Sequence, residues 1–235
     1  MWGKTTARLG AAMAGFVIAS VATTASAAPW SPAGIWAFNE SPNASTAFDT
    51  SGNGLNAAVG EDVNTGMTFN NRTYYNFPSE GAWGPPGHER LVLIPDSPEL
   101  DPGVGMYRVA IVFRTRAGGV NIIQKGQSNT YGGFWKIETH NGLATCLFRG
   151  SNDESSGVGS GSRVDDGQWH KVVCTRFPDR VVMRVDGEVT DTRYHVSGSV
   201  SNTKYLAIGG KPECGGSVGC DYYIGDIDYV RITTR

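Results

Sequence analysis

After its first 27 residues, the chain is a succession of short runs rich in Val, Ile, Tyr, Phe and Thr, separated by Gly, Asn, Asp and Pro. In 107–114 the apolar residues alternate with the others, the period of a strand with one face in a core. No later window places apolar residues at helical spacing. The chain is therefore predicted to consist almost entirely of strands and loops.

Further strands are expected where similar runs recur, at 35–40, 72–77, 90–94, 120–125, 134–139, 143–149, 169–176, 205–209 and 222–232. Asp186-Gly187 between 181–185 and 188–194 predicts a hairpin, because a two-residue turn needs positive φ. One open sheet of so many strands would leave long edges. We therefore expect an all-β, two-sheet antiparallel jelly-roll sandwich, forming one domain over 28–235.

The amino terminus is typical of a cleavable secretory signal over residues 1–27. Lys4 and Arg8 accompany an apolar run at 9–22, and Ala25-Ser26-Ala27 has the small residues that a signal peptidase reads. As a membrane anchor the run is shorter than the roughly 20 residues that a bilayer requires. The mature chain is expected to be secreted, with no later membrane insertion.

Charge excludes two classes of partner at this stage. The formal net charge is −2, and acidic and basic residues are interspersed along the chain. Nucleic acid and anionic membrane surfaces require a basic stripe, which the linear sequence does not show. Neither is expected as a partner.

The four cysteines are Cys146, Cys174, Cys214 and Cys220, an even number in a chain expected to be exported. They predict two disulfides, for which three pairings exist. Cys146 and Cys174 lie in consecutive strand-like runs that favour pairing with each other, which leaves Cys214 and Cys220 to close a short loop. Zinc is disfavoured because no CxxC pair occurs.

Four stretches in order resemble the laminin G-like pattern of exported bacterial proteins, within the concanavalin A-like superfamily. They are Trp36-Ala37-Phe38 with 49–57, then 166–173, then Val185-Asp186-Gly187 with 208–210, and finally 225–232. The resemblance covers almost the whole of 28–235. It implies that the first and last strands lie side by side and that Trp169 belongs to the core.

Domains of this kind often hold one structural calcium ion between the two chain ends. By resemblance, Asp49 and Asn53 would supply oxygens from the first loop, and Asp226 or Asp228 from the last strand. The alternative is that Asp49 and Asn53 form turns and the late aspartates face solvent.

Enzymatic activity is weakly supported by the residues. The superfamily includes glycoside hydrolases and polysaccharide lyases, but no Glu-x-Asp-x-Glu run occurs, and the remaining alternating pairs are Glu138 with His140 and Asp226 with Asp228. Trp169 with His170 is interpreted as a packing residue beside a polar one. No serine in a G-x-S-x-G setting accompanies a histidine.

We expect a secreted or cell-surface binding module for glycan or matrix-like ligands, because binding requires fewer specific residues than catalysis does. Two Gly-rich or Ser-rich segments, 81–88 and 151–161, are expected to be mobile surface loops where function resides. The candidate ligand-binding aromatics lie in or beside such segments: Trp83, Tyr131, Trp135, Tyr222 and Tyr223. A polysaccharide-active enzyme and a structural envelope protein are the alternatives.

Overall fold

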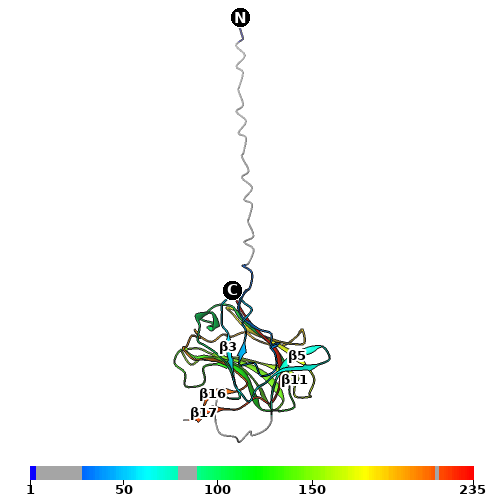
Figure 1. Cartoon of the computed structure of the whole chain (residues 1–235). Helices are drawn as coiled ribbons and strands as arrows, with labels where there is room; N and C mark the ends of the chain where they lie inside the picture. Colours follow the sequence, from blue (N-terminus) through cyan, green and yellow to red (C-terminus); the bar gives the residue numbers. More distant parts are fainter. Residues whose placement is uncertain (4–27, 79–88, 215–216) are drawn as a thin grey trace.

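The structure is a computed structural model that describes residues 1–3, 28–78, 89–214 and 217–235, without the side chains of 214 and 217–219. The described residues form strands β1 to β18 and a single short 3-10 helix, η1 (Pro98–Leu100). The strands build two eight-stranded antiparallel sheets that pack face to face, with a small separate hairpin (Figure 1). The expected all-β jelly-roll sandwich is confirmed.

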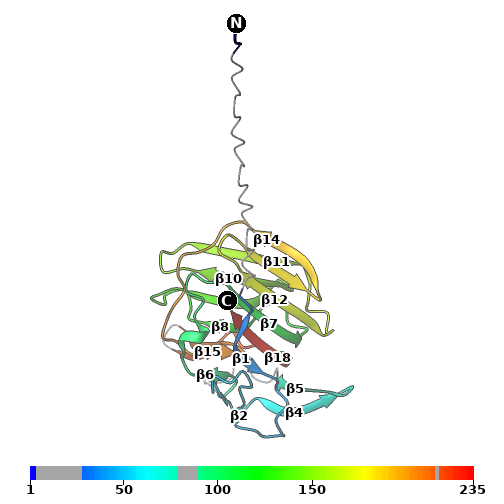
Figure 2. The ribbon, with the colours of Figure 1, turned by 90° about the horizontal axis from the view of Figure 1, so that it is seen from above.

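Sheet A carries the last strand at its centre. Its order is β14 (Glu188–Arg193), β13 (Val181–Val185), β12 (His170–Arg176), β7 (Tyr107–Arg114), β18 (Gly225–Thr234), β5 (Arg72–Phe77) and β4 (Asn64–Phe69), and β1 (Ser31–Trp36) also pairs with β18. The pairing of β1 with β18 confirms that the first and last strands are neighbours. Figure 2 shows the β4–β5 hairpin projecting from the body of the sandwich.

Sheet B forms the other layer. Its order is β11 (Ser155–Arg163), β10 (Leu143–Arg149), β9 (Phe134–His140), β8 (Val120–Lys125), β15 (Leu206–Ile208), β6 (Val92–Ile94), β3 (Ala57–Val59) and β2 (Thr46–Ala47). The separate hairpin consists of β16 (Lys211–Cys214) and β17 (Ser217–Cys220). None of the helices in the described part of the chain is long and apolar enough to span a bilayer.

Several predicted strands agree with the structure to the residue, among them 72–77, 107–114, 120–125, 143–149 and 181–185. The Asp186-Gly187 turn is also confirmed, because both residues have positive φ, 52° and 96°. Two expectations were wrong. The first strand ends at Trp36, whereas 35–40 was expected, and residues 155–161 of the supposed mobile segment 151–161 lie in strand β11.

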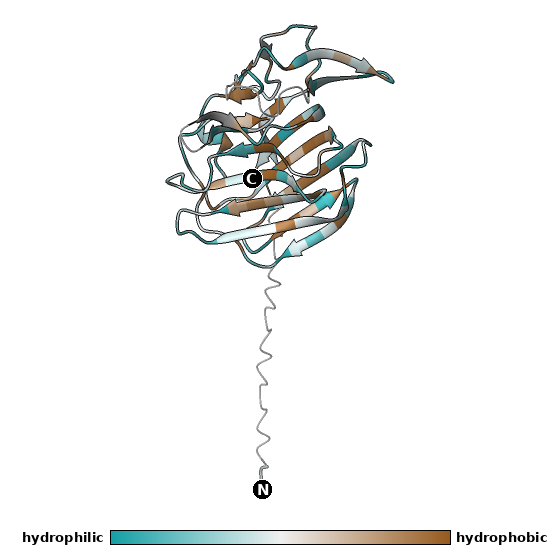
Figure 3. Ribbon diagram, turned by 90° about the horizontal axis from the view of Figure 1, so that it is seen from below, coloured by the Kyte–Doolittle hydropathy of each residue, from teal (hydrophilic) through white to brown (hydrophobic). Residues whose placement is uncertain are grey.

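Alternation of side chains separates the core from the two outer faces. On β7 the residues Tyr107, Val109, Ile111 and Phe113 are fully buried, whereas Arg108 and Arg114 point outward and are partly exposed. Hydrophobic residues gather on the strands and hydrophilic ones on the connecting loops (Figure 3). On strands such as β7, the core between the sheets is thus built by one residue in two.

A disulfide joins the two sheets through the core. Cys146 on β10 of sheet B bonds to Cys174 on β12 of sheet A, and both residues are buried. The predicted pairing is confirmed, but its reasoning was wrong, because these strands do not pair with each other. Cys220 is also disulfide-bonded. Its predicted partner Cys214 has a side chain outside the described part, so that pairing stays a prediction.

Candidate functional site

A shallow groove of about 620 Å³ crosses the outer face of sheet A. Its shape follows from the register of four strands. Arg231 of β18 pairs with Ala110 of β7, Ala110 with Val173 of β12, and Val173 with Arg184 of β13. Two short side chains therefore form a floor between two long ones. With strands about 4.8 Å apart, the two arginines start roughly 14 Å from each other.

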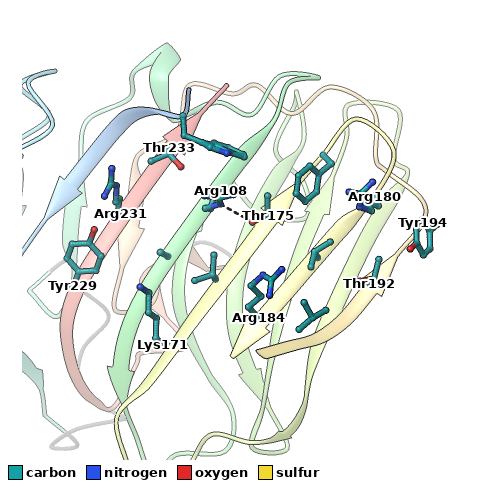
Figure 4. Close-up of a pocket in the computed structure, with 16 residues that line it drawn as sticks. Arg108, Lys171, Thr175, Arg180, Arg184, Thr192, Tyr194, Tyr229, Arg231 and Thr233 are labelled. Carbon is teal, nitrogen blue, oxygen red and sulfur yellow. Dashed lines mark hydrogen bonds between the residues drawn. The ribbon is translucent and has the colours of Figure 1, made fainter. Parts of the chain in front are cut away.

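The groove is strongly basic. In addition to Arg184 and Arg231, it is lined by Arg108, Lys171 and Arg180. All five project from the same side of the sheet (Figure 4). No Asp or Glu is among the described residues that line it. Only Arg180 has an ion-pair partner within the described part, Asp179 at 2.8 Å.

The four remaining cations therefore lie together without a neutralising carboxylate from the part of the chain that the structure describes. Burial lowers the pKa of Arg108, and the positive charges of Arg184 and Arg231 lower it further. Arg108 is held by a bond from its Nε to Thr175 Oγ1 at 3.2 Å. Like charges that repel in the free protein are a common feature of sites that bind an anion.

Aromatic rings flank these cations. Trp30, Phe177, Tyr194 and Tyr229 line the groove. The Arg108 guanidinium lies 4.0 Å from the centre of the Trp30 ring, and Arg180 lies 4.6 Å from that of Phe177. Groups that combine stacking faces with guanidinium donors suit a ligand with ring faces and anionic substituents.

Sequence reasoning missed this groove. Its cations come from separate segments, at 108, 171–184 and 231, and each segment alone carries only one or a few charges. The linear sequence has no basic stripe, but the folded surface does. Outward-facing positions on neighbouring strands bring the separate cations together there. The available sequence signal was the alternation at 229, 231 and 233, which places these three side chains on the same outer face of the last strand.

The predicted ligand-binding aromatics do not form one platform. Trp135 is fully buried against Tyr107, and Tyr223 is 1% exposed between Phe77 and Phe113. Neither ring offers a face to a ligand, so the prediction for these two residues is corrected to core packing.

The other three aromatics have different surroundings. Tyr131 is 98% exposed, at the edge of a small hollow with Arg149 and Asp153. Tyr222 is half-buried and lies under the Arg90 guanidinium. Trp83 and the segment 81–88 lie outside the described residues. None of the four predicted aromatics that the structure describes lines the basic groove.

The four predicted calcium ligands are engaged in hydrogen bonds and ion pairs. Partial burial raises the pKa of Asp49, but bonds that it accepts from the backbone N–H groups of Ile35, Ser51 and Leu55 outweigh this and lower the pKa. Asn53 donates to two backbone carbonyls of β1. This is the turn chemistry that was the alternative to a metal site.

The two late aspartates are paired with arginines. Asp226 accepts from Arg114 at 2.5 Å and from Asn76, and Asp228 pairs with Arg72. Within the described part of the chain, no group of three or more His, Cys, Asp or Glu side chains could hold a metal ion. These residues therefore do not fit a calcium site as they are arranged, and calcium binding stays a prediction.

Trp169 is not a core residue, contrary to the expectation from the resemblance. It lies half-buried immediately before β12, and the guanidinium groups of Arg72 and Arg114 lie 4.8 and 4.9 Å from its ring centre. The pairs considered for catalysis are also occupied. Glu138 bonds to Lys136 at 2.6 Å, and each late aspartate has its own arginine.

Comparisons with known proteins agree with this fold. The binding domain of Paraclostridial Mosquitocidal Protein 1 is 10% identical, with a TM-score of 0.61, and the match covers 87% of this chain and 47% of that one. The binding domain of botulinum neurotoxin serotype D is 16% identical, with a TM-score of 0.59 and the same coverage. A serotype D ligand binding domain in complex with N-acetylneuraminic acid is 14% identical, with a TM-score of 0.59 and again the same coverage.

The chain thus spans about half the length of these solved structures, and at such identities the likeness is one of fold. No curated protein matches the sequence. Residues 113–233, slightly more than half of the chain, match the laminin G domain and include most of the strands that bear the groove. The chain therefore belongs to the laminin G domain family.

Proposed function

We propose that this protein is a secreted binding module for an acidic glycan, which it holds in the basic groove of sheet A. The observation that carries the proposal is the set of four cations on one face of the sheet, Arg108, Lys171, Arg184 and Arg231, for which the described residues supply no carboxylate partner. A volume of about 620 Å³ is within the range of ligand sites. Carboxylate or sulfate groups would relieve the mutual repulsion of these cations.

An acidic glycan fits the groove better than other polyanions. The rings of Trp30 and Tyr229 lie at the side where β18 crosses the groove, and sugar rings stack on such faces through their C–H groups. A similarly folded ligand binding domain is described in complex with N-acetylneuraminic acid, a carboxylated sugar. Export is supported by the signal-like residues 1–27.

The site is tested by measuring binding of heparin, with neutral dextran as the control ligand. We expect Arg184→Gln/Arg231→Gln to weaken heparin binding at least tenfold, about 1.4 kcal/mol, because both ends of the groove lose their charge. The matched control is Arg193→Gln, an exposed arginine on the neighbouring β14 that does not line the groove.

Two results would contradict the proposal. One is equal affinity of the double variant and the wild type for heparin. The other is tighter binding of single-stranded DNA than of heparin at the same salt concentration, which would identify a nucleic-acid site. Export is tested separately by sequencing the amino terminus of protein recovered from the culture medium, which should begin near Ala28.

A further inference from the structure

A second pocket, of about 330 Å³, lies on the outer side of sheet B, the layer opposite the basic groove. Gln124 of β8 together with Phe134 and Lys136 of β9 form its base, and the β16–β17 hairpin contributes Lys211, Glu213 and Cys220. Figure 1 shows this hairpin standing apart from the two large sheets. We name this site the Gln124 pocket.

An irregularity in β8 places Gln124 there. The register of β8 with β9 shifts between Asn121 and Ile123, so that Ile122 and Ile123 are both buried in the core. Asn121 and Gln124 consequently share the outer face, where Asn121 Nδ2 donates to Gln124 Oε1 at 2.6 Å. Such bulges often redirect a side chain beside a binding site.

This bond leaves the amide nitrogen of Gln124 without a partner. Gln124 is only 2% exposed, and its Nε2 is a buried atom with no hydrogen-bond partner among the described residues. Buried polar groups in folded proteins are nearly always hydrogen-bonded, so an orphaned donor beside a pocket calls for an acceptor. The amide nitrogen can only donate, and the neighbouring Asn121 Oδ1 is likewise buried without a hydrogen-bond partner among the described residues.

The charges around the pocket are balanced, unlike those of the basic groove. Lys136 bonds to Glu138 at 2.6 Å, Glu213 bonds to Lys204 at 2.9 Å, and Lys211 pairs with Asp221. An ionic ligand would have to compete with these existing partners. A neutral ligand that offers an oxygen acceptor is the better match.

We infer that the Gln124 pocket is a second binding site, which takes a neutral sugar unit whose carbonyl or hydroxyl oxygen accepts a hydrogen bond from Gln124 Nε2. The site is independent of the proposed acidic-glycan groove, because it lies on the other sheet and the charges around it are paired. One molecule would thereby hold an acidic and a neutral sugar on its two faces.

The test follows the side-chain amide of Gln124 directly. N-acetylglucosamine and glucose are each added to the ¹⁵N-labelled protein up to about 10 mM, a range suited to weak monosaccharide binding. We expect a saturable shift of the Gln124 Nε2 resonances and of the Lys136 backbone amide with at least one sugar. Gln124→Leu should abolish the shift at Lys136, whereas Gln168→Leu, an exposed glutamine before β12, should retain it.

Gln124→Met serves as a second variant if Gln124→Leu unfolds, since a flexible side chain adapts to the same space. The inference is overturned if neither sugar shifts the Gln124 amide, or if the shift at Lys136 survives in the folded variant. Heparin binding should be unchanged in both Gln124 variants. Loss of the sugar response with intact heparin binding, or loss of heparin binding with an intact sugar response, therefore tests this pocket and the basic groove separately.

Discussion

Removing one charge from the basic groove should stabilise the fold while it weakens binding. In Arg231→Gln the side chain keeps a polar end but no longer repels Arg108. Arg231 is opposite Ala110 on the neighbouring strand, two residues along from Arg108, so the two Cα atoms are about 8 Å apart. Burial lowers the pKa of Arg108, and the positive charges of Arg184 and Arg231 lower it further, as expected for mutual repulsion of these side chains.

The size of the effect follows from the spacing. At about 8 Å, two unit charges repel by roughly 0.5 kcal/mol in water and about 2 kcal/mol at an effective dielectric constant of 20. Screening at physiological ionic strength reduces this about threefold, to roughly 0.2–0.7 kcal/mol. For a domain of this size, that corresponds to a rise in Tm of roughly 0.5–3 °C.

Thermal unfolding by circular dichroism and heparin titration of the same sample measure the two effects together. The reasoning predicts a Tm at or above that of the wild type with several-fold weaker heparin binding, the opposite signs typical of a functional residue. A Tm lowered by more than about 2 °C would mean that Arg231 is a structural residue, and the argument from unpaired charge would be refuted.

Three further predictions concern stability. Cys146→Ala/Cys174→Ala opens a disulfide of sequence separation 28 and should cost about 3.6 kcal/mol by loop entropy, a fall in Tm of roughly 7–14 °C; a fall below about 3 °C would contradict it. Lys125→Met leaves two carboxylates without their fully buried ammonium partner, so the urea midpoint should fall by the equivalent of about 3 kcal/mol, and an unchanged midpoint would refute the structural role of the pair. Partial burial lowers the pKa of His170, but bonds to Asp186 and Asp166 outweigh it and raise the pKa. Stability from His170 should therefore be complete below pH of about 6.5 and decline as the pH rises through the folded-state pKa, and the Tm of His170→Asn should lack this decline between about pH 6 and 8.

Strands with regular alternation were predictable from the sequence. On β7, β8, β10 and β13, either buried and outward residues alternate or an apolar run is bounded by turn residues. For these four strands the predicted bounds agree with the observed ones to the residue. The strand β11 was missed because its sequence, SSGVGSGSR, has almost none of the residues that favour strands. Pairing with β10 and contact with β13 and β14 override that local preference.

The candidate site was far less predictable than the fold. Sequence order indicates which side chains alternate, but the register of β18 on β7, and of β7 on β12, decides that Arg231 and Arg184 flank the same floor. Those pairings join segments more than 40 residues apart, and the linear pattern does not contain them. The late aspartates illustrate the converse, since Arg72 and Arg114 reach them only in the folded protein.

The most direct test of the central claim is the salt dependence of heparin binding to the wild-type protein. The groove presents four cations that have no carboxylate partner within residues 28–78, 89–214 and 217–235. We therefore expect the affinity to fall at least tenfold between about 50 and 500 mM NaCl, where the Debye length shrinks from about 14 to about 4 Å. Neutral dextran should not bind at either concentration. Heparin binding that is insensitive to salt, or equal binding of dextran, would contradict the account.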